Sequence, residues 1–431
     1  MKRKGRAAAA VLGAAVLAVS VAACGSSGGS SNNASSGNDF KGKTLTVWFM
    51  SGSNPPGWTK DITAAFEKDH PGAKLNVQVQ QWTGIQQKLT TALSESNPPD
   101  VFEVGNTQTP YYASTGGLMD LSSIKSDLGG NDWVPSLNGS AVYNGKQYAA
   151  PWYFADRVVI YNKQIWQKAG ITGPPQTMSE FESDLAKIQS SGTQDALYLP
   201  GENWYAFDGF LLDQGAQIVK QQGSAYVGNL DTPQAAAAIN LYKKLNSYGT
   251  APKDTDEATP QQYTVFAKGN VGSMIGLGWE AASAVAANPK LNGQIGYFAI
   301  PGSTAGTPAK VFLGGSNLAV AQNSKNQQLA QDFLKLAMSD QFEGELAKQN
   351  GIIPNKASLN SNLASSAYGT VAAAAAANGG TTPLIPTWGN VENPPNPIKT
   401  LYMAPVLQGT DPSSAAQKAD AQITKLLSQQ Q

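Results

Sequence analysis

Apolar residues near the start of the chain first follow the spacing of a strand and then that of a helix. The segment TLTVWF (44–49) is rich in β-branched and aromatic residues, which is typical of a strand. Trp58, Ile62 and Phe66 then recur at helical intervals until Pro71 interrupts the pattern. We therefore expect a strand followed by an amphipathic helix.

The same order is repeated in the next stretch of the chain. The segment KLNVQVQ (74–80) alternates apolar and polar positions, as a strand does, and Ile85, Leu89 and Leu93 then mark another amphipathic helix. DVFEV (100–104) reads as a third strand. This βαβαβ order predicts a parallel or mostly parallel sheet with crossover helices.

Further elements follow at intervals suited to a second α/β unit. Asn144-Gly145 between short apolar runs indicates a hairpin, and RVVIYN (157–162) indicates the next strand. Thr177 with Glu180 forms a capping box at a helix start. Strands at 271–277 and 317–321 and a helix at 326–338 are expected beyond it. A chain of 431 residues with this pattern favours two α/β lobes over one oversized sheet.

The N-terminus reads as an export signal. Basic residues precede an apolar run (7–23) that is too short to span a bilayer comfortably. The run ends in VAAC, and Cys24 is the only cysteine of the chain. This string resembles the bacterial lipobox, so we expect a lipoprotein signal peptide at 1–23 and a lipidated Cys24 followed by a Gly/Ser tether over 24–39. Ordinary cleavage that leaves a stray cysteine is the alternative.

Charge and composition exclude several classes of protein. The formal net charge is zero and no basic run follows the leader, so nucleic acid is not expected as a partner. GNDFKGKT (37–44) matches a phosphate-binding loop by its letters, but a tether precedes it and a strand follows it, whereas that loop must open a helix. We predict no nucleotide, no cofactor and no metal, and treat the acidic run of Asp254, Asp256 and Glu257 as a solvated turn rather than a calcium site.

Catalytic signatures are also sparse. His70 is the only histidine and stands before a proline at a helix end. The sequence therefore offers no histidine suited to act as the base in a Ser–His or Cys–His catalytic arrangement. Carboxylate pairs of the kind that hydrolyse glycosides stay possible from sequence, because distant acids can meet in space. The candidates are Asp156, Glu202, Asp208, Glu280 and Glu392.

Tryptophans are concentrated in loop-like segments, with polar neighbours that suit a ligand rich in hydroxyl groups. A sugar ring offers an apolar face and a rim of hydroxyls, which calls for aromatic platforms edged by amides and carboxylates. Each tryptophan could instead be a core residue, and we expect Trp48 and Trp166 to be core. The candidate ligand-binding residues are Trp82, Asn106, Gln108, Glu202, Trp204, Trp279, Glu280, Asn317 and Trp388.

Long segments of the chain resemble the bacterial extracellular solute-binding proteins of carbohydrate ABC importers, which are similar in layout to maltose-binding protein. The resemblance is carried by PPDVFEVGNTQTPYYASTGGLMDLS, NGKQYAAPWYFADRVVIYN, FAKGNVGSMIGLGW and GGSNLAVAQNSKNQQLAQDFLKLAMSDQ. It implies an α/β, two-lobed periplasmic-binding-protein fold with a sugar cleft between hinge-linked lobes. It places one lobe at 40–152 plus 313–355 and the other at 153–312 plus 356–431.

The resemblance also gives a role to the only arginine outside the leader. Asp156 and Arg157 would lie where the chain first crosses between the lobes, beside the cleft, and the guanidinium could donate to vicinal hydroxyls. A structural ion pair with a neighbouring carboxylate is the alternative for Arg157.

The function expected from sequence is capture of a sugar at the outer face of the cell membrane. We predict a lipid-anchored, monomeric protein, not an enzyme, that delivers its ligand to the transmembrane subunits of an ABC permease. QQWTGIQQKLTTAL and EVGNTQTPYY favour a β-linked disaccharide such as chitobiose or cellobiose. A secreted glycoside-active enzyme and a structural surface lipoprotein are the alternatives.

Overall fold

The computed structural model describes residues 40–350, 352–363 and 366–429. The expected signal peptide, Cys24 and the tether lie outside these residues. Within the described part of the chain, no helix has both the length and the apolar character needed to cross a membrane.

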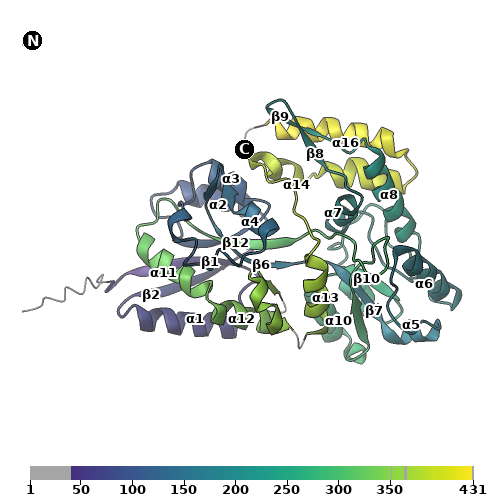
Figure 1. Ribbon diagram of the computed structural model, residues 1–431, viewed down its shortest axis with the longest axis horizontal. Coiled ribbons are helices and arrows are strands. Elements are labelled where there is room, and N and C mark those ends of the chain that lie inside the picture. The colour runs from purple at the N-terminus through teal and green to yellow at the C-terminus, as the bar shows by residue number, and fades with distance from the viewer. Residues whose placement is uncertain (1–39, 351, 364–365, 430–431) are drawn as a thin grey trace, which may run out of the picture. The chain divides into compact units, whose positions relative to one another are not determined.

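A six-stranded sheet forms the centre of what we call the first lobe (Figure 1). β1 pairs in parallel with β2 and β3, as the βαβαβ pattern predicts, whereas β12, β6 and β13 join antiparallel. In spatial order the strands are β13 (Ile353–Pro354), β6 (Ala150–Ala155), β12 (Gly314–Val320), β3 (Val101–Gly105), β1 (Thr44–Met50) and β2 (Lys74–Gln80).

Helices cover both faces of this sheet (Figure 1). On one face, Leu45, Val47 and Phe49 of β1 pack with Trp58 and Phe333, whose helices are α1 and α11. On the other face, α2 and α3 cover Phe102 and Val104 of β3. The helices of this lobe are α1 (Pro56–Asp69), α2 (Ile85–Ser94), α3 (Thr109–Ser114), α4 (Pro135–Ser140), α11 (Gln327–Ala337) and α12 (Asp340–Asn350).

The predicted hairpin is present in this lobe. β4 (Val142–Tyr143) pairs with β5 (Lys146–Gln147), and both turn residues have positive φ, 47° at Asn144 and 76° at Gly145. That backbone explains the Asn-Gly pair, because asparagine and glycine tolerate the left-handed region best. The hairpin prediction is therefore confirmed.

A three-stranded antiparallel sheet forms the centre of the second lobe. β7 (Val158–Asn162) lies between β10 (Ser273–Gly276) and β11 (Ile295–Phe298), and a separate hairpin joins β8 (Val219–Gln222) to β9 (Ala225–Gly228). β6 ends at Ala155 in the first sheet and β7 begins at Val158 in the second, so the chain passes between the sheets at Asp156 and Arg157.

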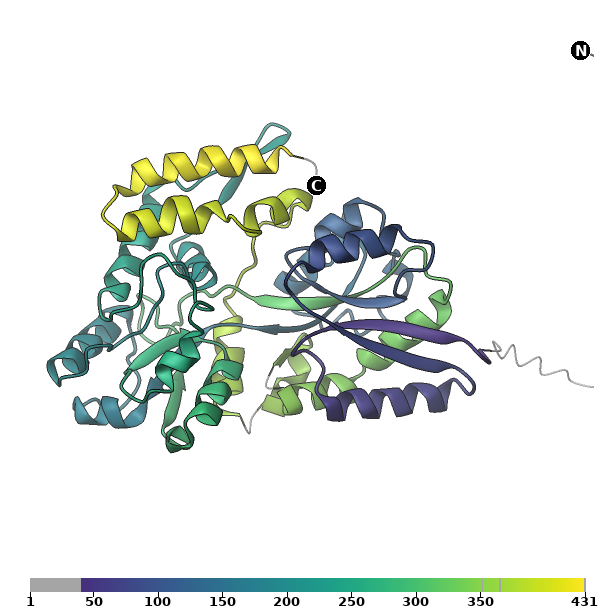
Figure 2. The ribbon, with the colours of Figure 1, turned by 180° about the vertical axis from the view of Figure 1, so that it is seen from behind.

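The helices of the second lobe come from the middle and from the C-terminal part of the chain. Figure 2 shows α16 beside the β8–β9 hairpin, and α16 packs on β9. The helices are α5 (Lys163–Lys168), α6 (Met178–Ser190), α7 (Trp204–Asp213), α8 (Pro233–Asn246), α9 (Gln262–Phe266), α10 (Gly278–Ala287), α13 (Ala367–Ala376), α14 (Gly389–Glu392), α15 (Ala404–Leu407) and α16 (Pro412–Leu427). Shorter helical turns lie at Ser122–Ile124, Pro289–Leu291, Ala357–Leu363, Pro386–Trp388 and Ile398–Met403.

The start predicted for α6 is confirmed with one difference. The Thr177 hydroxyl accepts from the Glu180 amide at 3.2 Å, as in a capping box, but the Glu180 carboxylate accepts from the amide of Gln176 rather than that of Thr177. Trp166 is buried and its Nε1 donates to the Ser273 hydroxyl at 3.0 Å, so its prediction as core is confirmed. Trp48 is only partly buried but packs against the apolar cluster that contains Leu89 and Phe102, so its prediction as core is confirmed in part.

Candidate functional site

The loops that follow β2 and β3 bring Trp82 and Gln108 to one edge of the first sheet. Since these strands both run parallel to β1, their carboxyl ends lie at the same edge, where α/β sheets bind ligands. The Trp82 ring is 44% exposed and lies beside Gly105, where a Cβ atom would be 3.7 Å from a ring carbon. Trp82 therefore presents an open aromatic surface at the end of β3.

A cavity of about 470 Å³ opens beside Trp82, with a wall from each lobe. Ile85, Gln86 and Thr90 of α2, together with Gln108 and Tyr111, line its first-lobe side. The second lobe contributes Asn390, Asn393 and Pro394. The Asn393 amide donates to the side-chain oxygen of Gln86, so the two lobes touch at the rim of this cavity.

Two of the predicted amides serve the protein's own framework. Asn106 Nδ2 donates to the backbone oxygen of Leu313 at 3.0 Å, and its Oδ1 accepts from the Gly315 amide at 3.3 Å. Asn317 Nδ2 donates to the hydroxyls of Thr109 and Ser140 at 2.8 and 3.1 Å. Both side chains are buried. In this conformation Asn106 holds the start of β12, and Asn317 holds β12 against α3 and α4, so neither side chain faces a ligand.

Arg157 is held by an ion pair and by an aromatic ring. Its guanidinium donates to Glu257 at 2.8 Å, and its Cζ lies 5.1 Å from the ring centroid of Tyr205. The Tyr205 hydroxyl in turn donates to Glu392 at 2.7 Å. This conformation therefore contains the structural ion pair that was the alternative prediction for Arg157. The ring of Tyr205 provides a flat aromatic surface under the guanidinium.

Asp156 and Glu280 are buried carboxyl groups near this arginine. Burial raises the pKa of both side chains, and the charge of Arg157 opposes that rise. Glu280 accepts from the Leu277 amide and from Gln262, both at 2.8 Å, which caps α10. Asp156 and Glu280 are both buried, so neither carboxyl group has a surface that a sugar could contact in this conformation.

The three tryptophans predicted as platforms differ in burial. Trp388 is fully buried, and Trp204 is nearly so, with its ring centroid 4.2 Å from that of Tyr205. Trp279 is 50% exposed and meets the ring of Tyr263 edge-on. The apolar cluster of the second lobe includes Trp204 and Trp388. Trp204 and Trp388 are therefore core residues in this structure. Their place in loop-like segments of the sequence does not reveal how deeply those loops pack.

Two of the three acids considered for calcium, Asp256 and Glu257, pair with basic side chains of the protein. Lys399 Nζ lies 2.8 Å from Asp256 and 3.9 Å from Glu202, while Glu257 pairs with Arg157. Burial raises the pKa of Glu202, and Lys399 opposes this effect. Among the described residues no group of histidine, cysteine and acidic side chains is arranged to hold a metal ion.

The acids considered for glycoside hydrolysis do not form an open pair. Burial, with a further effect from the charge of Glu392, raises the pKa of Asp208 to about 7. Asp208 is buried in α7, however, and Glu392 accepts from Tyr205. A hydrolase needs its two carboxyl groups on either side of an accessible bond, so this pair has no place for a substrate.

Sequence reasoning missed three residues that shape the arrangement. Tyr111 and Asn393 line the cavity beside Trp82, and Tyr205 lies under Arg157. Tyr111 could have been found from its place directly after the third strand. Tyr205 and Asn393 have no comparable signal, because their partners are far away in the chain.

Comparisons with known proteins identify the family of the chain. The protein-family description "Bacterial extracellular solute-binding protein" matches residues 51–343. The diacetylchitobiose binding protein DasA of Streptomyces coelicolor is 56% identical over 392 residues, which cover 91% of this chain and 92% of that protein.

Solved structures show the same fold. The GacH receptor of Streptomyces glaucescens, crystallised unliganded and with acarbose, is 25% identical with a TM-score of 0.75, covering 89% of this chain and 98% of that one. The sugar-binding protein MalE of Xanthomonas citri, 21% identical, has a TM-score of 0.79 and covers 89% of this chain and 97% of its own. These likenesses confirm the two-lobed fold expected from sequence. The family match and the identity with DasA show that the chain belongs to the bacterial extracellular solute-binding proteins.

Proposed function

We propose that this protein captures diacetylchitobiose, or a closely related β-linked disaccharide such as cellobiose, and delivers it to an ABC permease. The observation that carries the proposal is the 56% identity with a diacetylchitobiose binding protein over 91% of the chain. The protein acts by binding and release, as a monomer and without chemistry on the sugar.

The cavity beside Trp82 supports a neutral sugar as the ligand. Its lining combines one exposed indole with the amides of Gln86, Gln108, Asn390 and Asn393, and it contains no charged side chain. Amides donate and accept hydrogen bonds, so they suit both hydroxyl and acetamido groups. Trp82 offers the flat apolar surface on which a sugar ring stacks.

Because residues of both lobes line the cavity, a bound ligand can change the balance between open and closed arrangements of the lobes. A sugar that contacts Gln108 on one side and Asn390 on the other binds best when the lobes are closed, and it shifts the population towards that state. The lobes would extend over 40–152 plus 313–355 and 153–312 plus 356–431, with the exposed Trp279 as a further contact from the second lobe. Glu202, Trp204 and Arg157 remain proposed contacts for an opened or sugar-bound state.

Replacing Trp82 by alanine is expected to weaken binding of diacetylchitobiose by about tenfold to a hundredfold, the effect of losing an aromatic contact at a binding site. The fold should be unaffected, because the ring is 44% exposed. Isothermal titration calorimetry measures the change. Tyr226→Ala is the matched control, since Tyr226 is 39% exposed and lies on the remote β9 strand. Equal affinity of Trp82→Ala and the parent protein would contradict the position of the site.

Cys24 is the proposed point of attachment to the membrane. A lipidated cysteine carries enough acyl chain for stable anchoring, so the mature protein should sediment with membranes when cells are fractionated. Cys24→Ala should be released into the medium, as judged by immunoblotting of both fractions. The same distribution for both forms would show that Cys24 is not the anchor.

A further inference from the structure

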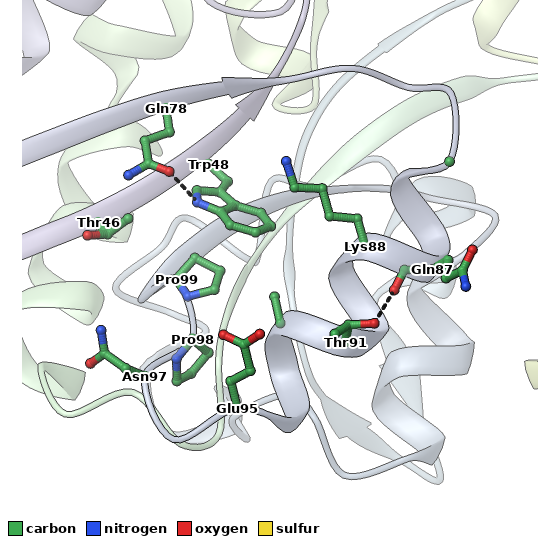
Figure 3. Close-up of a pocket in the computed structure, with 12 residues that line it drawn as sticks. Thr46, Trp48, Gln78, Gln87, Lys88, Thr91, Glu95, Asn97, Pro98 and Pro99 are labelled. Atoms are coloured by element: carbon green, nitrogen blue, oxygen red, sulfur yellow. Dashed lines mark hydrogen bonds between the residues drawn. The ribbon is translucent and has the colours of Figure 1, made fainter.

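A second cavity, of about 580 Å³, lies entirely on the first lobe (Figure 3). Trp48 of β1 and Gln78 of β2 form one side, and α2 forms the other with Lys88 and Thr91. The segment from Glu95 to Pro99 closes the end of the cavity. No predicted function accounts for this cavity.

The indole of Trp48 is held in a fixed orientation within it. Its Nε1 donates to Gln78 Oε1 at 3.0 Å, and Lys88 Nζ lies 5.3 Å from the ring centroid. Lys88 is itself positioned by a hydrogen bond to Gln80 at 2.6 Å. Because these contacts are already formed, a ligand that stacks on Trp48 would lose little entropy in ordering the ring.

The rest of the lining suits a neutral, hydroxyl-rich ligand. Figure 3 shows Gln78 and Pro99 next to the indole, with Thr91, Asn97 and Pro98 farther along the cavity. The cavity has one basic and one acidic side chain, Lys88 and Glu95, so it has no net preference for an anion or a cation. An aromatic surface surrounded by amide and hydroxyl groups is the same combination as in the cavity beside Trp82.

The two cavities adjoin each other around the first turns of α2. They share Gly84, Gln87 and Thr91 in their linings. Gly84 precedes the helix with a φ of 74°, and no atom lies within 4 Å of the place where its Cβ would be. The surface that joins the cavities is therefore free of bulky side chains at this point.

We propose that the Trp48 cavity is an outer subsite that binds the distal units of a saccharide whose other end occupies the Trp82 cavity. This inference rests on the proposed function and extends the ligand class from disaccharides to longer neutral oligosaccharides. In this proposal the saccharide continues from the Trp82 cavity past Gly84, and one of its distal sugar rings stacks on Trp48.

A chain-length series tests the subsite. Calorimetric affinities are measured for diacetylchitobiose and for the β-linked tetramer and pentamer of N-acetylglucosamine, with the parent protein, Trp48→Leu and Tyr226→Ala. Leucine keeps apolar volume beside the Leu89 and Phe102 cluster but removes the flat ring. The pentamer should bind the parent about tenfold more tightly than the disaccharide, equivalent to about 1.4 kcal/mol. Trp48→Leu should lose this gain, keep the disaccharide affinity and melt near the parent.

The possible results are distinguishable. An equal gain with chain length in Trp48→Leu, or no gain in the parent, would overturn the outer subsite while leaving the proposed function intact. Failure of the parent to bind any of the three sugars or cellobiose would overturn both proposals. If Trp48→Leu is unstable, chemical-shift perturbation of the Trp48 indole N–H in the parent decides: a shift with the pentamer alone supports the subsite, and a shift with neither sugar rejects it.

Discussion

Replacing Trp388 by alanine is expected to lower the free energy of unfolding by about 3–5 kcal/mol, as for other large-to-small changes of a buried aromatic residue. The side chain is fully enclosed, and its ring centroid lies 6.4 Å from that of Trp204. Alanine would leave a cavity that these rigid neighbours cannot fill. Urea unfolding at equilibrium measures the loss.

Trp279→Ala is the matched control for this substitution. Trp279 is 50% exposed, so its removal should change stability by less than about 1 kcal/mol, as is usual for surface positions. It should instead reduce sugar affinity if Trp279 contacts the ligand. Similar unfolding energies for the two variants would contradict the placement of Trp388 in the core and of Trp279 at the surface.

Arg157→Ala is expected to destabilise the protein at neutral pH by at most about 3–5 kcal/mol, the range for removing one partner of a fully buried ion pair, because Arg157 and Glu257 are mostly but not completely shielded from water. Its side chain is 11% exposed, and its removal would leave Glu257 without its cation. The buried carboxyl groups of Asp156 and Glu280 would also lose the charge that now opposes the rise in their pKa values.

The destabilisation by Arg157→Ala should grow as the pH rises. The folded-state pKa values of Asp156 and Glu280 are raised above those of the unfolded chain, so these groups favour folding when protonated, and that contribution is lost as the pH rises through the folded-state values. Removing Arg157 raises them further. The difference in unfolding energy between variant and parent should therefore be smaller at about pH 5 than at about pH 8.

Lys146→Ala provides the control, because Lys146 is 60% exposed and pairs with Asp120 at the surface. Such pairs contribute about 0–1 kcal/mol. Chemical unfolding at both pH values compares the variants. A loss for Arg157→Ala as small as that for Lys146→Ala would contradict a structural role for this ion pair.

Much of the first lobe could be predicted because its elements are local and strongly periodic. Leu45, Val47 and Phe49 alternate in β1, and Trp58, Ile62 and Phe66 recur in α1, so each pattern has only one ready interpretation. The antiparallel β12 was expected as a strand, but its partners could not be expected. Its pairing with β3 and β6 joins residues that lie far apart in the chain, such as Val320 with Val101 and Ser316 with Tyr153.

The candidate site was harder to predict because burial decides which polar and aromatic residues are free. Asn106 and Gln108 are both amides in the same loop of the sequence. The side chain of Asn106 is hydrogen-bonded to the backbone of Leu313 and Gly315, whereas Gln108 lines a cavity. Trp388 and Trp279 both follow loop-like segments, yet only Trp279 is exposed. These differences arise from tertiary packing, which local patterns do not encode.

The most direct test of the proposed function is a calorimetric titration of the purified protein with diacetylchitobiose, cellobiose and maltose, followed by mass spectrometry of the recovered sugar. We predict saturable binding of a β-linked disaccharide at one site, weaker or no binding of maltose, and recovery of the sugar intact. Binding of maltose alone, cleavage of any of these sugars, or the absence of binding to all three would contradict the proposal.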